Sequence, residues 1–111
     1  MNAEEFRHIA LEMEGAREGA HMGHPDFRVG GKIFATLHYP DSDSAVVLLN
    51  PEEQKDFVRL SPHAFAPVKG AWGLRGSTQL ILSAADENMV REAVMTAWRR
   101  RSAPNRRGGV S

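Results

Sequence analysis

The chain has 111 residues, of which 41% are hydrophobic and 25% are charged, a length and composition typical of one globular domain. Fourteen basic residues balance fourteen acidic ones, so the formal net charge is zero, and the sequence contains no cysteine. These properties exclude a disulfide framework, a thiolate metal site, a thiol nucleophile and a uniformly basic protein, and they predict a cytoplasmic location.

Nothing in the sequence predicts a membrane segment. The opening residues 1–5 are acidic and polar, unlike a secretory signal. No uninterrupted apolar run reaches ten residues, whereas a membrane-spanning helix needs about twenty. We therefore expect a soluble protein without a membrane partner.

The N-terminal segment has the pattern of a helix. Asn2, followed three residues later by Glu5, has the spacing of a capping box. Apolar residues then recur at helical spacing. We predict a helix from about Ala3 to about Arg17, ended by the segment 19–25 with its glycines and proline.

A β-meander is predicted next. Residues 27–29 and 32–39 are short runs rich in β-formers. The pair Gly30 and Gly31 between them supplies the positive φ angles of a tight hairpin turn. A polar turn then leads to a third strand at residues 45–49.

A short helix is predicted after the meander. Asn50 as the N-cap, Pro51 at the first helical position and Glu53 at the third form a strong start signal. We expect this helix to reach about Leu60. The strand that follows, at residues 65–69, contains a proline, which indicates an edge position in the sheet.

The remaining pattern predicts a loop, a strand and a long helix. Residues 70–76 contain three glycines and are predicted to form the loop, and residues 77–82 the strand. Soon after Ser83, apolar residues recur with the period of an amphipathic helix. Residues 1–104 are thus expected to form a single α+β domain, a two-layer sandwich with an antiparallel sheet. Residues 105–111 are expected to be a basic, disordered tail.

Several blocks of the sequence resemble the MmcQ/YjbR family. The most specific block is residues 24–35, His-Pro-Asp-Phe-Arg-Val-Gly-Gly-Lys-Ile-Phe-Ala, and weaker matches follow in order, including residues 72–76 and 97–99. The resemblance implies a CyaY-like fold, in which the N- and C-terminal helices pack on one face of an antiparallel sheet. It also implies DNA binding by a double-wing arrangement of β-hairpins.

The zero net charge hides an asymmetry along the chain. Residues 1–56 carry eleven acidic and five basic residues, a charge of minus six, and residues 57–111 carry three acidic and nine basic residues, a charge of plus six. Such asymmetry is typical of a nucleic-acid surface. Arginines at a helix end and in a tail also complement the helix dipole and aid solubility, which is the alternative interpretation.

Basic residues flank the predicted hairpin turn and the glycine-rich loop. Others lie at the C-terminal end of the last helix. Such positions suit contacts to phosphate groups, although solvated cations are the alternative. Trp72 in the loop either stacks on a base or packs over the edge of the core. The predicted nucleic-acid-binding residues are Arg28, Lys32, Lys69, Trp72, Arg75, Arg99, Arg100 and Arg101.

Metal binding has weaker signals. His21, His24 and Asp26 are close enough in sequence to suggest a metal site, but the glycine and proline among them disturb the spacing, so we predict no metal. We expect His24 to brace the turn before the first strand. Glu14 and Glu18 on the first helix suggest weak cation binding by analogy with frataxins, which share the CyaY-like fold, but a solvated helix face explains the same residues.

The sequence has no nucleophile elbow, P-loop or dinucleotide fingerprint. We therefore predict neither a catalytic residue nor a cofactor, and a protein that is not an enzyme. The expected partner is DNA. The alternative is a protein-interaction or regulatory module that presents opposed acidic and basic faces to another protein, and the oligomeric state is left open.

Overall fold

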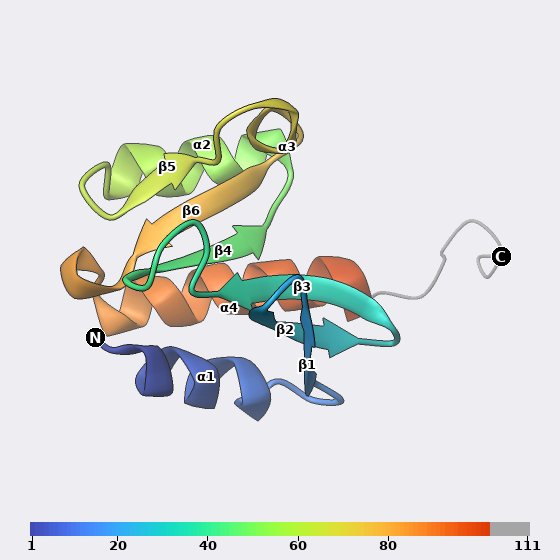
Figure 1. The fold of residues 1–111 in the computed structure, drawn as a ribbon. Coiled ribbons are helices and arrows are strands. Elements are labelled where there is room, and N and C mark those ends of the chain that lie inside the picture. Colours follow the sequence, from blue (N-terminus) through green and yellow to red (C-terminus); the bar gives the residue numbers. More distant parts are fainter. Residues whose placement is uncertain (103–111) are drawn as a thin grey trace, which may run out of the picture.

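The structure, a computed structural model, describes residues 1–102 as an α+β fold with one six-stranded sheet (Figure 1). The elements are α1 (Ala3–Glu12), β1 (Arg17–His21), β2 (His24–Val29), β3 (Lys32–Leu37), β4 (Ser44–Leu48), α2 (Pro51–Leu60), β5 (Phe65–Pro67), α3 (Ala71–Leu74), β6 (Ser77–Ile81), the 3-10 turn η1 (Leu82–Ala84) and α4 (Glu87–Ser102). The strands follow the order β1-β2-β3-β4-β6-β5, and every neighbouring pair is antiparallel. The α+β prediction is confirmed, and the predicted tail at residues 105–111 lies outside the described residues.

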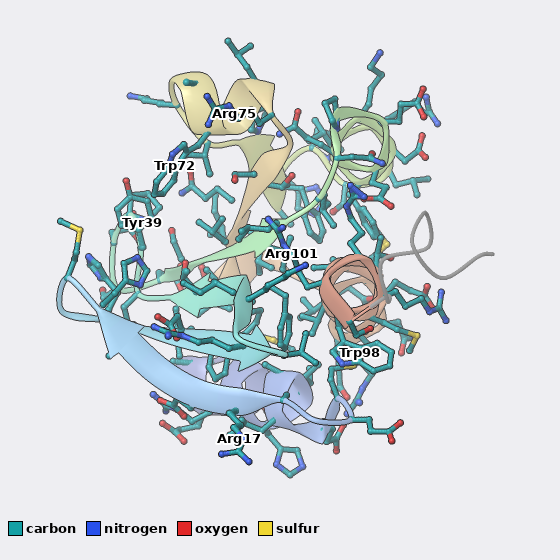
Figure 2. All side chains as sticks on the ribbon, turned by 90° about the vertical axis from the view of Figure 1, so that its right-hand side faces the viewer. Arg17, Tyr39, Trp72, Arg75, Trp98 and Arg101 are labelled. Carbon is teal, nitrogen blue, oxygen red and sulfur yellow. The ribbon has the colours of Figure 1, made fainter. Side chains whose placement is uncertain are left out.

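Helices α1, α2 and α4 cover one face of the sheet and leave the other face open (Figure 2). Phe27 of β2 packs edge-on against Phe6 of α1 with ring centroids 6.1 Å apart, and Phe65 of β5 contacts Phe57 of α2 at 5.4 Å. The strand register places Phe27 and Phe65 on the same face of the sheet. Four fully buried residues of α4 complete this core: Val90, Ala93, Val94 and Ala97.

A β-bulge in β3 shapes the open face. Phe27 pairs with Ala35, but Arg28 pairs with Ile33, so Phe34 is an extra residue in the ladder. Phe34 and Ala35 are both fully buried on the helix side. The bulge shifts the alternation of side chains between the two faces of the sheet. Ile33 and Thr36 therefore both lie on the open face.

The first helix is shorter than predicted. The capping box is present, with Asn2 Oδ1 accepting from the Glu5 N–H at 2.8 Å. The helix nevertheless ends at Glu12 rather than at about Arg17, and Gly15 turns the chain with φ 76°. Residues 17–21 form β1, an edge strand whose mostly exposed side chains give no apolar alternation for a sequence pattern to reveal.

The second half follows its predicted order, with two short elements added, α3 and η1. The capping box of Asn50 and Glu53 begins α2, and β5, which contains Pro67, is an edge strand as predicted. Residues 70–76, predicted as a loop, contain the short helix α3. Within residues 1–102, no helix is long and apolar enough to cross a membrane.

Candidate nucleic-acid interface

The predicted nucleic-acid-binding residues come from three segments at one end of the molecule, on the right in Figure 1. The segments are the β2–β3 turn, residues 69–76 around α3, and the C-terminal end of α4. We call this the basic end and define it by its cations Arg28, Lys32, Lys69, Arg75, Arg99, Arg100 and Arg101. Folding therefore brings together cations that are up to 73 positions apart in the sequence.

Acidic residues gather at the opposite end of the molecule. The starts of α1 and α4 and the β3–β4 turn lie there, on the left in Figure 1. Their acidic residues are Glu4, Glu5, Asp41, Asp43, Asp86 and Glu87. The charge asymmetry of the sequence is thus also an asymmetry between the two ends of the fold, although Glu52 and Glu53 at the start of α2 lie near the basic end.

Two cations of the basic end are paired with carboxylates. Arg100 Nε lies 3.4 Å from Glu53 Oε1, and Arg28 is bound to Asp26. The other five have no carboxylate within 4.0 Å among residues 1–102: Lys32, Lys69, Arg75, Arg99 and Arg101. These five keep their full charge for an anionic partner.

Arg28 belongs to an ionic network around the buried carboxylate of Asp26. Its Nε and Nη2 atoms donate to the two carboxylate oxygens of Asp26 at 2.8 and 2.9 Å, and His21 Nδ1 lies 2.9 Å from Asp26 Oδ2. The hydrogen bond from Arg28, followed by that from His21, lowers the pKa of Asp26, although burial of the carboxylate opposes the shift. A guanidinium held in this way has less charge to offer a phosphate, and the contact of Arg28 with DNA stays a prediction.

The histidines of this segment take separate partners. His21 contacts Asp26, whereas the ring of His24 packs edge-on against Tyr39 with centroids 5.2 Å apart. No group of three His, Asp or Glu side chains that could hold a metal ion is found within residues 1–102. His24 is the first residue of β2, and its contact with Tyr39 links that strand to the chain just after β3.

Helix α3 presents Trp72 to solvent and is held by a residue that the sequence pattern does not single out. Trp72 is 55% exposed and is not among the residues that pack against the core, so part of its ring is open to a partner. Buried Gln54 of α2 donates from Nε2 to the carbonyl oxygens of Gly73 at 3.0 Å and Ser77 at 2.9 Å. Gln54 thereby holds the segment around α3 at two points, at Gly73 between Trp72 and Arg75 and at Ser77 just after them. Its position among polar helix residues gives no sign of this role.

Arg17 is a further cation, outside the set predicted from the sequence. It is the first residue of β1 and lies directly across the ladder from Arg28. In Figure 2, Arg17 lies at the lower edge of the sheet, away from Trp72 and Arg75 at the top. A correct prediction of β1 would have placed Arg17 beside Arg28.

Carboxylates on and just after α1, where the sequence suggested weak cation binding, form ion pairs within the protein. Glu12 lies 2.8 Å from Arg91 and 3.1 Å from His8, and the hydrogen bond from Arg91 lowers the pKa of Glu12. Glu18 lies 3.0 Å from Arg7. The prediction that Glu14 and Glu18 lie one turn apart on a helix is wrong, because both follow the end of α1.

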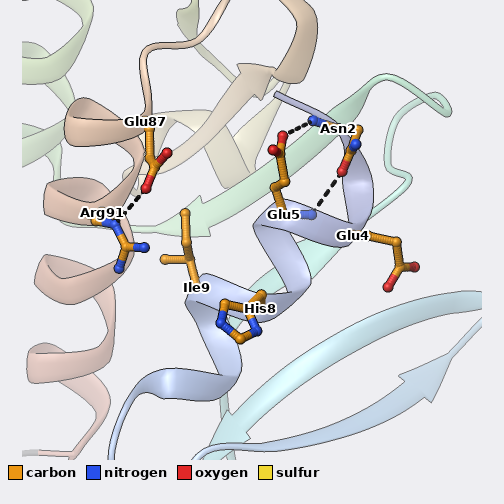
Figure 3. Close-up of a pocket in the computed structure, with 7 residues that line it drawn as sticks. All are labelled: Asn2, Glu4, Glu5, His8, Ile9, Glu87 and Arg91. Atoms are coloured by element: carbon orange, nitrogen blue, oxygen red, sulfur yellow. Dashed lines mark hydrogen bonds and ion pairs between the residues drawn. The ribbon is translucent and has the colours of Figure 1, made fainter.

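A hollow of about 340 Å³ lies between the starts of α1 and α4 (Figure 3). Its carboxylates also have partners. Glu5 accepts from the Asn2 N–H in the capping box, and Glu87 accepts from Arg91 at 3.0 Å. Carboxylates that already accept hydrogen bonds have fewer free acceptor sites for a cation.

A larger cavity, of about 750 Å³, lies on the open face of the sheet beside the basic end. It is lined by residues of several strands and the adjoining segments, including Trp72, Arg75 and Arg101. Figure 2 shows Trp72 and Tyr39 close together at one side, with Arg101 reaching across from the end of α4. Trp72, Arg75 and Arg101 were predicted from the sequence as nucleic-acid-binding residues, but the cavity that they share was not.

Comparison with known proteins identifies relatives of this fold. The sequence model of the YjbR family matches residues 11–100. The crystal structure of a Deinococcus radiodurans protein with a DUF419 domain is similar, with a TM-score of 0.75 and 12% identity over 96% of this chain and 86% of that one. No protein with a curated description matches. At this identity, the likeness to the solved structure supports the fold alone.

Proposed function

The chain belongs to the YjbR family, and from this premise we propose that it binds DNA, with the basic end contacting phosphate groups. The proposal joins the function implied by the sequence resemblance to one structural observation. Five cations from three separate segments, each without a carboxylate partner in residues 1–102, gather at one end of the molecule. A surface of this kind attracts a polyanion and orients it away from the acidic end.

The arrangement favours binding to the DNA backbone. Lys32 contacts phosphate from the β2–β3 turn, and Lys69 and Arg75 do so from the connection between β5 and β6, which contains α3. The double-wing arrangement of β-hairpins stays a prediction. Backbone contacts position a protein but carry no base information. Among residues 1–102, no helix presents a row of base-reading side chains at this end, so we propose non-specific or weakly specific binding without catalysis.

The two other functions suggested by the sequence stay predictions. A protein-interaction module would use the same charged ends, and it would leave the protein without affinity for DNA at low salt. A cation-binding protein would need carboxylates that the ion pairs of Glu12 and Glu18 now occupy.

Replacing Lys32, Lys69 and Arg75 with alanine is expected to weaken binding to a labelled duplex by about tenfold to a hundredfold at low salt. Each lost phosphate contact also reduces the slope of log affinity against log salt by about one. Fluorescence anisotropy at several salt concentrations measures both quantities. Arg28 is left unchanged, because its removal would unpair the buried Asp26 carboxylate.

The matched control is the triple variant Arg7→Ala, Arg59→Ala and Arg91→Ala, which removes the same number of cations. Arg7 lies on α1, Arg59 in the last turn of α2 and Arg91 in the first half of α4, all outside the basic end. The control is expected to keep the affinity and the salt slope of the natural protein. Equal effects of the two sets of substitutions would show that the basic end has no special part in binding.

A further inference from the structure

We propose that the cavity on the open face of the sheet binds a planar aromatic ring that carries an anionic group, the chemistry of a nucleotide. This inference goes beyond duplex binding, because it concerns a cavity on the open face of the sheet. Arg75 and Arg101 belong both to the basic end and to the lining of this cavity. The cavity volume of about 750 Å³ lies within the range of known small-molecule sites.

The floor of the cavity is apolar where an open sheet face is usually polar. Ile33, Val46 and Leu48 line it from β3 and β4, on the face opposite the helices. Ile33 and Leu48 are partly exposed there, whereas Val46, which is 3% exposed, is already covered by its neighbours. A solvated sheet face carries polar residues in alternation, so apolar residues here indicate a surface that meets another apolar group.

Aromatic rings form one wall. Trp72 comes from α3 and Tyr39 from the segment after β3, and His24 braces the Tyr39 ring. Figure 2 shows Trp72 and Tyr39 next to each other at the edge of the open face. Trp72 stays 55% exposed. Exposed aromatic faces of this kind stack on planar rings, including nucleobases.

The charged groups of the cavity are cationic. Arg75 and Arg101 line it, neither has a carboxylate within 4.0 Å in the described part of the chain, and no Asp or Glu is among the lining residues. A guanidinium presents paired N–H groups that match a phosphate or carboxylate. The ligand therefore has to carry negative charge as well as an apolar ring.

One polar atom of the cavity lacks a partner. Thr36 lines the cavity, and its Oγ1 atom is buried without a hydrogen bond from residues 1–102. A buried hydroxyl left unsatisfied costs free energy that a ligand with a polar atom at this depth recovers. Thr36 therefore supplies an orienting contact between the apolar floor and the cationic rim.

The test compares thymidine monophosphate with thymidine, which has the same base and sugar but no phosphate. We expect isothermal titration to give at least about tenfold tighter binding of the monophosphate, because only the phosphate reaches the two guanidinium groups. Replacing Arg75 and Arg101 with alanine is expected to remove that difference. The double variant Lys55→Ala and Arg59→Ala is the matched control, since it removes the same charge from α2 and neither residue lines the cavity.

Leu48→Trp fills the cavity from its floor without changing any charge. It is expected to abolish binding of the monophosphate and to leave duplex binding unchanged, which separates this inference from the proposed function. Thermal unfolding checks that the variant is folded. A short oligothymidylate, titrated in parallel, identifies the source of the ligand. Binding of the monophosphate assigns the site to a free nucleotide, and binding of the oligothymidylate alone, lost in Leu48→Trp, assigns it to an unpaired strand.

Three results would overturn the inference. The first is that neither the monophosphate nor the oligothymidylate binds. The second is that thymidine binds as tightly as its monophosphate. The third is that a folded Leu48→Trp protein binds both probes as well as the natural protein does.

Discussion

The variant Gly73→Ala is expected to lower the free energy of unfolding by at least about 3 kcal/mol, because α3 lies too close to the preceding segment to accept a side chain. A Cβ atom at this position would lie 1.7 Å from the Val68 carbonyl oxygen and 2.8 Å from its carbonyl carbon. These are backbone atoms, which no rotamer change can move away. The segment from Val68 to Ser77 would have to shift, and the hydrogen bond of Gln54 to the Gly73 carbonyl would be lost.

Urea denaturation measures this loss, and Gly30→Ala is the control. Gly30 has φ 59°, and a Cβ atom added there would have no neighbour within 4 Å, so alanine meets only the strain of the left-handed backbone. That strain costs about 1 kcal/mol. Similar losses in the two variants would contradict the close approach of α3 to Val68. If Gly73→Ala remains folded, its Trp72 emission is expected to change, because the helix that carries the indole is displaced.

The variant Asp26→Asn is expected to lower the free energy of unfolding by about 3 kcal/mol at neutral pH. The Asp26 carboxylate is fully buried beneath Arg28 and His21, which form hydrogen bonds to both of its oxygens. Breaking a buried ion pair by removing one partner costs about 3 to 5 kcal/mol. We expect the lower end of this range, because the side chains of Arg28 and His21 are both 39% exposed and water can reach them.

The same variant has a defined pH dependence. The folded state lowers the pKa of Asp26 from its ordinary value of 3.8, so the ionised carboxylate stabilises the fold above that pH. This stabilisation is lost as the pH falls from about 4 through the lowered pKa of the folded state. Urea denaturation at neutral pH and at about pH 3 should therefore give a smaller difference between the natural protein and Asp26→Asn in acid. A difference that stays constant with pH would show that the Asp26 charge does not stabilise the fold.

Local signals in the sequence predict most of the fold. The capping boxes at Asn2 and Asn50 begin the two helices where expected, and the two glycines after Val29 form the expected turn. Each of these signals acts within a few residues of its own position. The missing element is β1, which is defined by pairing with β2 rather than by its own composition, since residues 17–21 show no apolar alternation.

The two parts of the candidate site differ in how far the sequence predicts them. The basic end follows from charge counting, because the cations lie at turns and at a helix end. The cavity depends on which strands are neighbours, since its floor combines residues of β3 and β4. The sequence does contain one signal of the cavity. Strand β4 is apolar at successive positions, including Val46 and Leu48 on the face away from the helices, which indicates that both faces of this strand meet apolar groups.

The salt dependence of duplex binding by the natural protein tests the central claim most directly. Five phosphate contacts predict micromolar or tighter binding at about 50 mM salt and a slope of log affinity against log salt of about −4 to −5. Fluorescence anisotropy with a labelled duplex of arbitrary sequence gives both values. Absence of binding at micromolar protein in low salt, or a slope near zero, would contradict a DNA-binding role for the basic end.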